Sequence, residues 1–174
     1  MSGQFLYTPP APESIALSEI RETRGSASGA GRLFGIVASR YNWEIGELLV
    51  GGAVDCLQRH GVEPENIHLV SVPGAWEIPQ ALEEVAAAGG LEGLVAIGVV
   101  IRGETPHFDY ICAEASRGIA SVAERHRVPV GFGLLTCDTL EQARERAGGQ
   151  AGNKGWEAAL AALEMADLFA RLRP

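Results

Sequence analysis

The sequence predicts an α/β protein with three layers, in which a four-stranded parallel sheet lies between two layers of helices. Four short apolar runs alternate with longer segments in which apolar residues recur every three to four positions. Consecutive strand–helix–strand units of this kind wind with a right hand and build a parallel sheet. The length of 174 residues suits one domain.

The predicted strands are the four apolar runs, Leu33–Ala38, Ile67–Val72, Leu94–Ile101 and Val130–Thr136. The segments between them, 45–57, 78–86 and 111–122, have the periodicity of amphipathic helices. Asp138 with Glu141 predicts a capping box that opens a short helix. Asn153 is expected to cap a final helix, Lys154–Leu172.

Residues 1–31 differ in composition from the rest, since they are rich in Ser, Pro, Gly and Ala and contain scattered acids. We expect a flexible N-terminal arm there, followed by one domain over residues 32–174. The start of the chain has neither a basic region with an apolar core nor the acid-poor composition of a transit peptide, and no apolar stretch reaches about 20 residues. These features predict a cytoplasmic protein without a membrane segment.

The charge and the cysteines exclude several classes of function. Fourteen Lys and Arg against 22 Asp and Glu give a formal net charge of -8, which disfavours nucleic acid or an anionic membrane as a partner. The three cysteines are widely spaced and form no Cys-x-x-Cys pair. We therefore expect reduced thiols, with neither a disulfide framework nor a metal site.

The final helix contains the string Ala158–Leu163, which is apolar around its whole circumference. A surface helix normally keeps one polar face. We expect such a helix to pack on two sides, the second side against another subunit, and so predict a homo-oligomer.

Four segments follow the strand ends and are expected to meet at one edge of the sheet, where ligands bind in open α/β folds. They are 39–42, 72–77, 102–107 and 136–138. Histidine is the residue type suited to proton transfer near neutral pH. His107 lies in a loop whose Gly103 and Thr105 can donate to an anion, so it is the candidate proton shuttle. A loop histidine can also be a solvated bystander, and Glu77 at a helix start can be only a dipole partner.

The segment 144–155 combines arginines, glycines and a helix start, which is suitable chemistry for a phosphate. It is not a P-loop, because Gly155 stands where a Ser or Thr would hold magnesium. Arg146, next to the glycine turn, is the candidate phosphate ligand.

With these residues in view, the chain resembles lumazine synthase over about residues 33–172. The resemblance rests on ordered motifs, namely Tyr41–Asn42, Val72–Pro79, Gly98–Asp109, Pro129–Thr136, Glu141–Ala143, Arg146–Gly148 and Gly152–Gly155. It implies a flavodoxin-like sheet and a transferase of riboflavin biosynthesis that needs neither metal nor organic cofactor. The implied reaction condenses 5-amino-6-ribitylamino-2,4-pyrimidinedione with 3,4-dihydroxy-2-butanone 4-phosphate to give 6,7-dimethyl-8-ribityllumazine, phosphate and two waters.

The resemblance also implies a role for each site residue. His107 would transfer protons and Arg146 would bind the phosphate, while Phe132 would arrive from a neighbouring subunit. The remaining substrate-binding residues implied in this way are Tyr41, Ala75, Trp76, Glu77, Val99, Val100, Ile101, Gly103, Glu104 and Thr105. The implied assembly is a homopentamer or an icosahedral capsid, a shell of sixty subunits.

The sequence departs from the family pattern at two positions. Tyr41 stands where phenylalanine is more common, and a phenol stacks as well as a phenyl ring. Gln150 stands where many members have lysine, which predicts weaker phosphate binding. Two other functions are considered: a non-catalytic lumazine- or flavin-binding shell or carrier, and a flavodoxin-like electron carrier. The second is disfavoured because residues 39–42 lack the hydroxyl run expected around a flavin phosphate.

Overall fold

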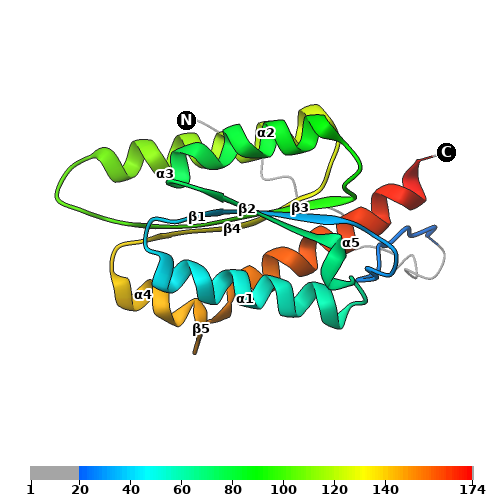
Figure 1. Cartoon of the computed structure of the whole chain (residues 1–174), viewed down its shortest axis with the longest axis horizontal. Helices are drawn as coiled ribbons and strands as arrows, with labels where there is room; N and C mark the ends of the chain where they lie inside the picture. The colour runs from blue at the N-terminus through cyan, green and yellow to red at the C-terminus, as the bar shows by residue number, and fades with distance from the viewer. Residues whose placement is uncertain (1–19, 174) are drawn as a thin grey trace, which may run out of the picture.

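A computed structural model of the chain describes residues 20–173 (Figure 1). Four strands alternate with helices along the chain, as the sequence predicts. The strands are β1 (Phe34–Ser39), β2 (Ile67–Val72), β3 (Gly93–Ile101) and β4 (Val130–Cys137). The long helices are α1 (Trp43–Arg59), α2 (Ile78–Ala88), α3 (His107–His126) and α5 (Lys154–Leu172). The shorter elements are η2 (Pro64–Asn66), η3 (Ala75–Glu77), α4 (Leu140–Glu145), β5 (Ala147–Gly149) and β6 (Gly152–Asn153).

The four strands form one parallel sheet in the order β2-β1-β3-β4. The two central strands are almost completely buried, which is why they read as continuous apolar runs in the sequence. The edge strands are less buried: only Val72 is buried in β2, and β4 exposes Phe132 and Thr136 between buried residues. The predicted four-stranded parallel sheet is confirmed.

Helices cover both faces of the sheet, so the predicted three-layer α/β/α architecture is confirmed as well. In Figure 1, α2 and α3 lie on one face, and α1, α4 and α5 lie on the other. The side chains of β1 alternate between two separate cores: Ile36 and Ala38 pack with α1 and α5, whereas Val37 packs with α2 and α3. The residue-by-residue alternation of a strand produces this division.

Helix α5 packs against α1, β3 and β4 of its own chain. Within the alanine-rich string, Ala158, Ala159, Ala162 and Leu163 are buried in these contacts. The second apolar side is therefore covered largely by α1, and the apolar circumference by itself does not require another subunit. None of the helices among residues 20–173 is long and apolar enough to cross a membrane.

The helix caps agree with the sequence at one position and differ at another. The Asn153 side chain accepts hydrogen bonds from the backbone N–H groups of Gly155 and Trp156, as predicted for the cap of α5. The predicted capping box of Asp138 with Glu141 is wrong by one residue. Thr139 is the cap of α4, and its Oγ1 accepts from the N–H of Gln142 at 3.2 Å. Both Asp and Thr are good caps, so composition alone does not choose between neighbours.

Part of the predicted arm makes specific contacts with α5. The Asp167 carboxylate accepts hydrogen bonds from the N–H and hydroxyl of Ser26, both at 2.8 Å, and pairs with Arg32 at 2.8 Å. Gly25 lies so close to α5 that a Cβ atom there would be 2.0 Å from the carbonyl oxygen of Glu164. Residues 1–19 of the predicted arm lie outside the described residues.

Candidate active site

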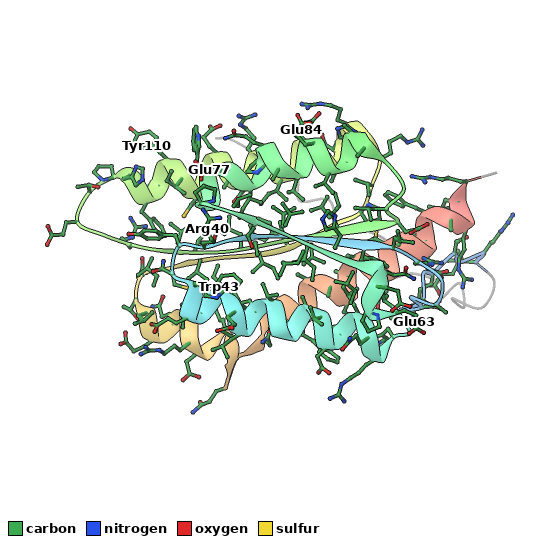
Figure 2. The ribbon with its side chains drawn as sticks, in the orientation of Figure 1. Arg40, Trp43, Glu63, Glu77, Glu84 and Tyr110 are labelled. Carbon is green, nitrogen blue, oxygen red and sulfur yellow. The ribbon has the colours of Figure 1, made fainter. Side chains whose placement is uncertain are left out.

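A cavity of about 920 Å³ lies at the carboxyl ends of the strands. Its walls come from the loop after β1, the turn after β2, the end of β3 and the start of α3. This is the edge of the sheet at which the sequence places the candidate site. In Figure 2, the labelled Glu77 and Tyr110 lie at this end of the molecule and Glu63 at the other.

The first wall carries Tyr41, which follows β1 and is 71% exposed. Its backbone N–H donates to the carbonyl of Pro73, which places it beside the turn after β2. The next residue, Asn42, has the left-handed conformation (φ 57°), which asparagine tolerates better than most residues. The Asn42 amide donates to the carbonyl of Val99 at 3.0 Å and so ties this loop to the end of β3.

The second wall is the turn 74–77, which ends in η3 and leads directly into α2. The Glu77 carboxylate accepts a hydrogen bond from the N–H of Gly74 at 2.9 Å, so one of its oxygens closes the turn. Trp76 is 48% exposed in the same wall, and Ala75 is buried behind it. Glu77 therefore has a structural contact in addition to its place in the cavity wall.

The third wall runs from the end of β3 into α3 and includes Val99–Ile101, Gly103 and Thr105. His107 is exposed and also lines the cavity. The sequence places His107 in a loop, but it is the first residue of α3, with Pro106 as the cap. The first turn of a helix needs no apolar periodicity, so the sequence pattern begins only at Ile111.

Arg102 belongs to the predicted cluster 102–107, but it does not line the cavity and pairs with acidic side chains instead. Its guanidinium pairs with Asp138 at 2.8 Å and with Asp109 at 3.1 Å. It also stacks over the ring of Phe108 at 4.1 Å from the centroid. These contacts join the end of β3 to the start of α3 and to the end of β4, and so hold the segment that precedes His107.

Four cavity residues are not among the predicted site residues: Gly74, Phe108, Tyr110 and Ile111. Once α3 is known to begin at His107, the spacing i, i+3, i+4 puts Tyr110 and Ile111 on the same helix face as His107. Tyr110 and Ile111 were missed because the sequence did not show that α3 begins at His107.

Three predicted site residues do not line the cavity within one chain: Glu104, Phe132 and Arg146. Phe132 lies on the edge strand β4 and is 51% exposed. Arg146 follows α4 on the other face of the sheet, and its guanidinium donates to the carbonyl of Gln142 at 3.0 Å. His107 and Arg146 of the same chain thus do not share this cavity.

The cavity is lined mainly by aromatic and aliphatic side chains. Its ionisable lining residues are Glu77, His107 and two tyrosines, Tyr41 and Tyr110. None of the described residues that line it is Lys or Arg. The aromatic rings can stack on a planar polar ligand, and the imidazole can move a proton at its rim. A phosphate in this cavity would meet no Lys or Arg side chain among the described lining residues of the same chain.

The thiols and the metal-binding residue types form no further centre. All three cysteines are free, and desolvation raises the pKa of the Cys56 thiol to about 11. Desolvation also raises the pKa values of Cys112 and Cys137. Among residues 20–173, no three His, Cys, Asp or Glu side chains are grouped so that they could hold a metal ion.

The chain is similar to known proteins over most of its length. Residues 31–170 match the family described as 6,7-dimethyl-8-ribityllumazine synthase. The chain is 56% identical to the protein of that name from Aquifex aeolicus over 149 residues, which are 86% of this chain and 97% of the relative. It is 53% identical to the one from Desulfovibrio desulfuricans (85% and 95%) and 48% identical to the one from Chlorobium phaeobacteroides (87% and 97%). On this evidence the chain belongs to the 6,7-dimethyl-8-ribityllumazine synthase family.

Proposed function

We propose that this protein is the transferase that condenses 5-amino-6-ribitylamino-2,4-pyrimidinedione with 3,4-dihydroxy-2-butanone 4-phosphate, a step of riboflavin biosynthesis. The observation that carries the proposal is the combination, in one cavity, of an exposed aromatic ring, a carboxylate and an imidazole: Tyr41, Glu77 and His107. The family relationship supports the same reaction. The products are 6,7-dimethyl-8-ribityllumazine, inorganic phosphate and two waters.

In this proposal the pyrimidine stacks on Tyr41, next to Trp76. Ala75 and Glu77 contact the ring and the ribityl chain, and Val99–Ile101 border the ring. His107 moves the protons that imine formation and phosphate elimination require. Positioning of two substrates in one cavity supplies much of the rate. The backbone N–H groups of Gly103 and Glu104, and the backbone or hydroxyl of Thr105, donate to the phosphate group.

We propose further that a neighbouring copy of the chain completes each site, with Phe132 covering the ring and Arg146 binding the phosphate. Two observations support this. The cavity within one chain has no Lys or Arg among its described lining residues, and Phe132 is exposed on an edge strand. Guanidinium binds phosphate in a two-point geometry, so Arg146 would satisfy the charge that one chain leaves uncompensated.

A subunit-mixing experiment tests this arrangement. His107→Ala and Arg146→Ala chains are each strongly impaired in the proposal. They are unfolded together, refolded together in equal amounts and assayed for lumazine absorbance. If the two residues meet across an interface, random assembly gives about a quarter of the sites both intact residues. If both residues must come from one chain, no site regains activity, and that result would refute the shared site.

The proposed assembly is a homo-oligomer in the cytoplasm, either a pentamer or a sixty-subunit shell of pentamers. Since one chain weighs 18.4 kDa, a pentamer has a mass of five times 18.4 kDa, or about 92 kDa, and a shell is twelve times heavier. Mass photometry separates these sizes. A monomer at micromolar concentration would contradict the proposal.

The alternative of a non-catalytic carrier is tested with His107→Ala alone. A carrier needs no proton shuttle, so the two functions predict different results for this variant. In an enzyme, His107→Ala slows turnover by about 10²–10⁴-fold while lumazine binding persists. Turnover that is unchanged in the variant would favour the carrier.

A further inference from the structure

A second cavity, of about 550 Å³, lies at the opposite edge of the sheet. It is bordered by Arg32 before β1, the last turn of α2 and the loop 89–92, the amino end of β3, the segment 126–129 at the end of α3 and the last turns of α5. It shares no lining residue with the candidate active site. The C-terminus is at this end of the molecule in Figure 1.

The charge of this cavity is opposite to that of the protein. Three arginines line it, Arg32, Arg127 and Arg173, whereas the chain as a whole carries a formal net charge of -8. Glu92 is the only acidic residue among the described lining residues, and its carboxylate already accepts a hydrogen bond from the N–H of Leu33 at 2.7 Å. Positive charge is therefore concentrated here against the overall charge, which favours an anionic ligand.

The three arginines differ in their hydrogen bonds and ion pairs. Arg32 pairs with Asp167 at 2.8 Å, and Arg173 donates to the carbonyl of Arg127. Arg173 therefore caps the carboxyl end of α3, a structural role that needs no ligand. The Arg127 guanidinium has no hydrogen bond or ion pair with another side chain in the part of the chain that the structure describes.

Arg127 also has an unfavourable backbone. It ends α3 in the left-handed conformation (φ 52°), a position that glycine or asparagine normally occupies. The arginine side chain does not favour this backbone conformation. Its guanidinium lines the cavity and has no side-chain partner among the described residues. A residue that is conformationally disfavoured and electrostatically unpaired suggests a role outside the stability of the fold.

The rest of the lining is apolar, with Val85, Leu91, Leu94, Val128 and Phe169 among its residues. The volume is within the range of small-molecule sites, which commonly combine an apolar surface with a few polar groups. We propose that this cavity binds a small organic anion: its phosphate or carboxylate group pairs with Arg127 and Arg173, and its apolar body contacts Phe169 and the aliphatic side chains. The proposal is independent of the function proposed for the first cavity.

The test uses phenyl phosphate as the probe, with inorganic phosphate and the uncharged benzyl alcohol as comparisons. Calorimetry at low salt measures affinity, and hydrogen–deuterium exchange shows which segments become protected. Exchange is needed because phenyl phosphate can also enter the first cavity. We expect phenyl phosphate to protect residues 126–129 and 169–173, benzyl alcohol to leave them unprotected, and inorganic phosphate to bind more weakly.

Two variants separate binding from folding. Arg127→Gly removes the guanidinium and suits the left-handed backbone, so we expect Tm to stay the same or rise while affinity at this site falls about tenfold or more. Arg117→Gln is the matched control, since it removes one positive charge from the exposed surface of the same helix, outside the cavity. It should leave binding unchanged.

Three results would overturn the proposal. Protection of residues 126–129 that persists unchanged in Arg127→Gly would show that this guanidinium does not bind the anion. Inorganic phosphate binding as tightly as phenyl phosphate would refute an organic ligand. A lower Tm for Arg127→Gly would show that the arginine is part of the helix end. Formation of lumazine by Arg127→Gly at the wild-type rate is expected in every case, so failure of this proposal leaves the first one intact.

Discussion

Gly155, at the start of α5, is the position at which a single methyl group is expected to have the largest effect on the fold. A Cβ atom at this glycine would lie 1.9 Å from the carbonyl oxygen of Leu49 and 2.7 Å from its carbonyl carbon. Both are backbone atoms of α1, so no side-chain rotation can relieve the overlap. Gly155→Ala therefore forces α1 and α5 apart.

The size of the effect follows from these distances. Real Cβ atoms essentially never approach closer than 3.0 Å, so the helices must separate by at least 3.0 minus 1.9, or about 1.1 Å. A radial gap of about 1 Å forfeits a quarter to a half of each van der Waals contact across the packed surface. Overpacking of this kind costs about 1–3 kcal/mol, and a backbone collision belongs at the upper end. At about 2–4 °C per kcal/mol for a chain of this size, Tm should fall by about 6–12 °C.

The assay is thermal unfolding followed by circular dichroism at one fixed protein concentration, because Tm depends on concentration for any chain that self-associates. Gly51→Ala in α1 is the matched control, since a Cβ there has no neighbour within 4 Å and the backbone is helical. It should stabilise the protein by about 0.5–1 kcal/mol. A Tm for Gly155→Ala within about 2 °C of wild type would refute the inferred close contact of the two helices.

Three further predictions concern charged and polar positions. Hydrogen bonds from the Ser26 N–H, from Arg171 and from the Ser26 hydroxyl lower the pKa of Asp167, so the carboxylate stabilises the fold above about pH 4 and stops doing so as the pH falls further. The Tm difference between wild type and Asp167→Asn should therefore shrink below that pH, and a constant difference would contradict this. Arg102→Gln should lower kcat several-fold, because the segment before His107 loses the ion pairs that hold it. KM and Tm should change little, since exposed ion pairs contribute only about 0–1 kcal/mol to stability. An unaltered kcat would count against a role of Arg102 in positioning His107. Gln150→Lys should lower KM for the phosphorylated substrate, and an unchanged KM would show that the missing cation is immaterial.

The two central strands, β1 and β3, were predictable because a strand that is buried on both faces is a continuous apolar run in the sequence. Each predicted strand agrees with the structure within one residue, as Ile67–Val72 and Leu94–Ile101 illustrate. The start of α3 was less predictable, because Pro106 and His107 belong to a first turn that needs no apolar face. The final helix Lys154–Leu172 was predicted with its cap, since Asn153 satisfies its free N–H groups.

The candidate site was predictable as far as chain order determines it. Tyr41, Glu77 and His107 meet because parallel strands end at one edge of the sheet. The position of Arg146 on the other face of the sheet could not be obtained in this way, since it depends on how α4 and the β5–β6 turn fold back. Whether it reaches the cavity of a neighbouring copy stays a prediction, because periodicity describes one chain only.

The three free thiols have a practical consequence for experiments on this protein. Only the thiolate reacts with alkylating reagents, and all three native cysteines are held in the protonated form by burial, Cys56 most strongly. A cysteine introduced on an open surface keeps an ordinary pKa of about 8.5 and reacts much faster at neutral pH. Fluorophores can therefore be attached at a chosen position without removing any native cysteine, so that the proposed homo-oligomer can be tested by energy transfer between labelled chains.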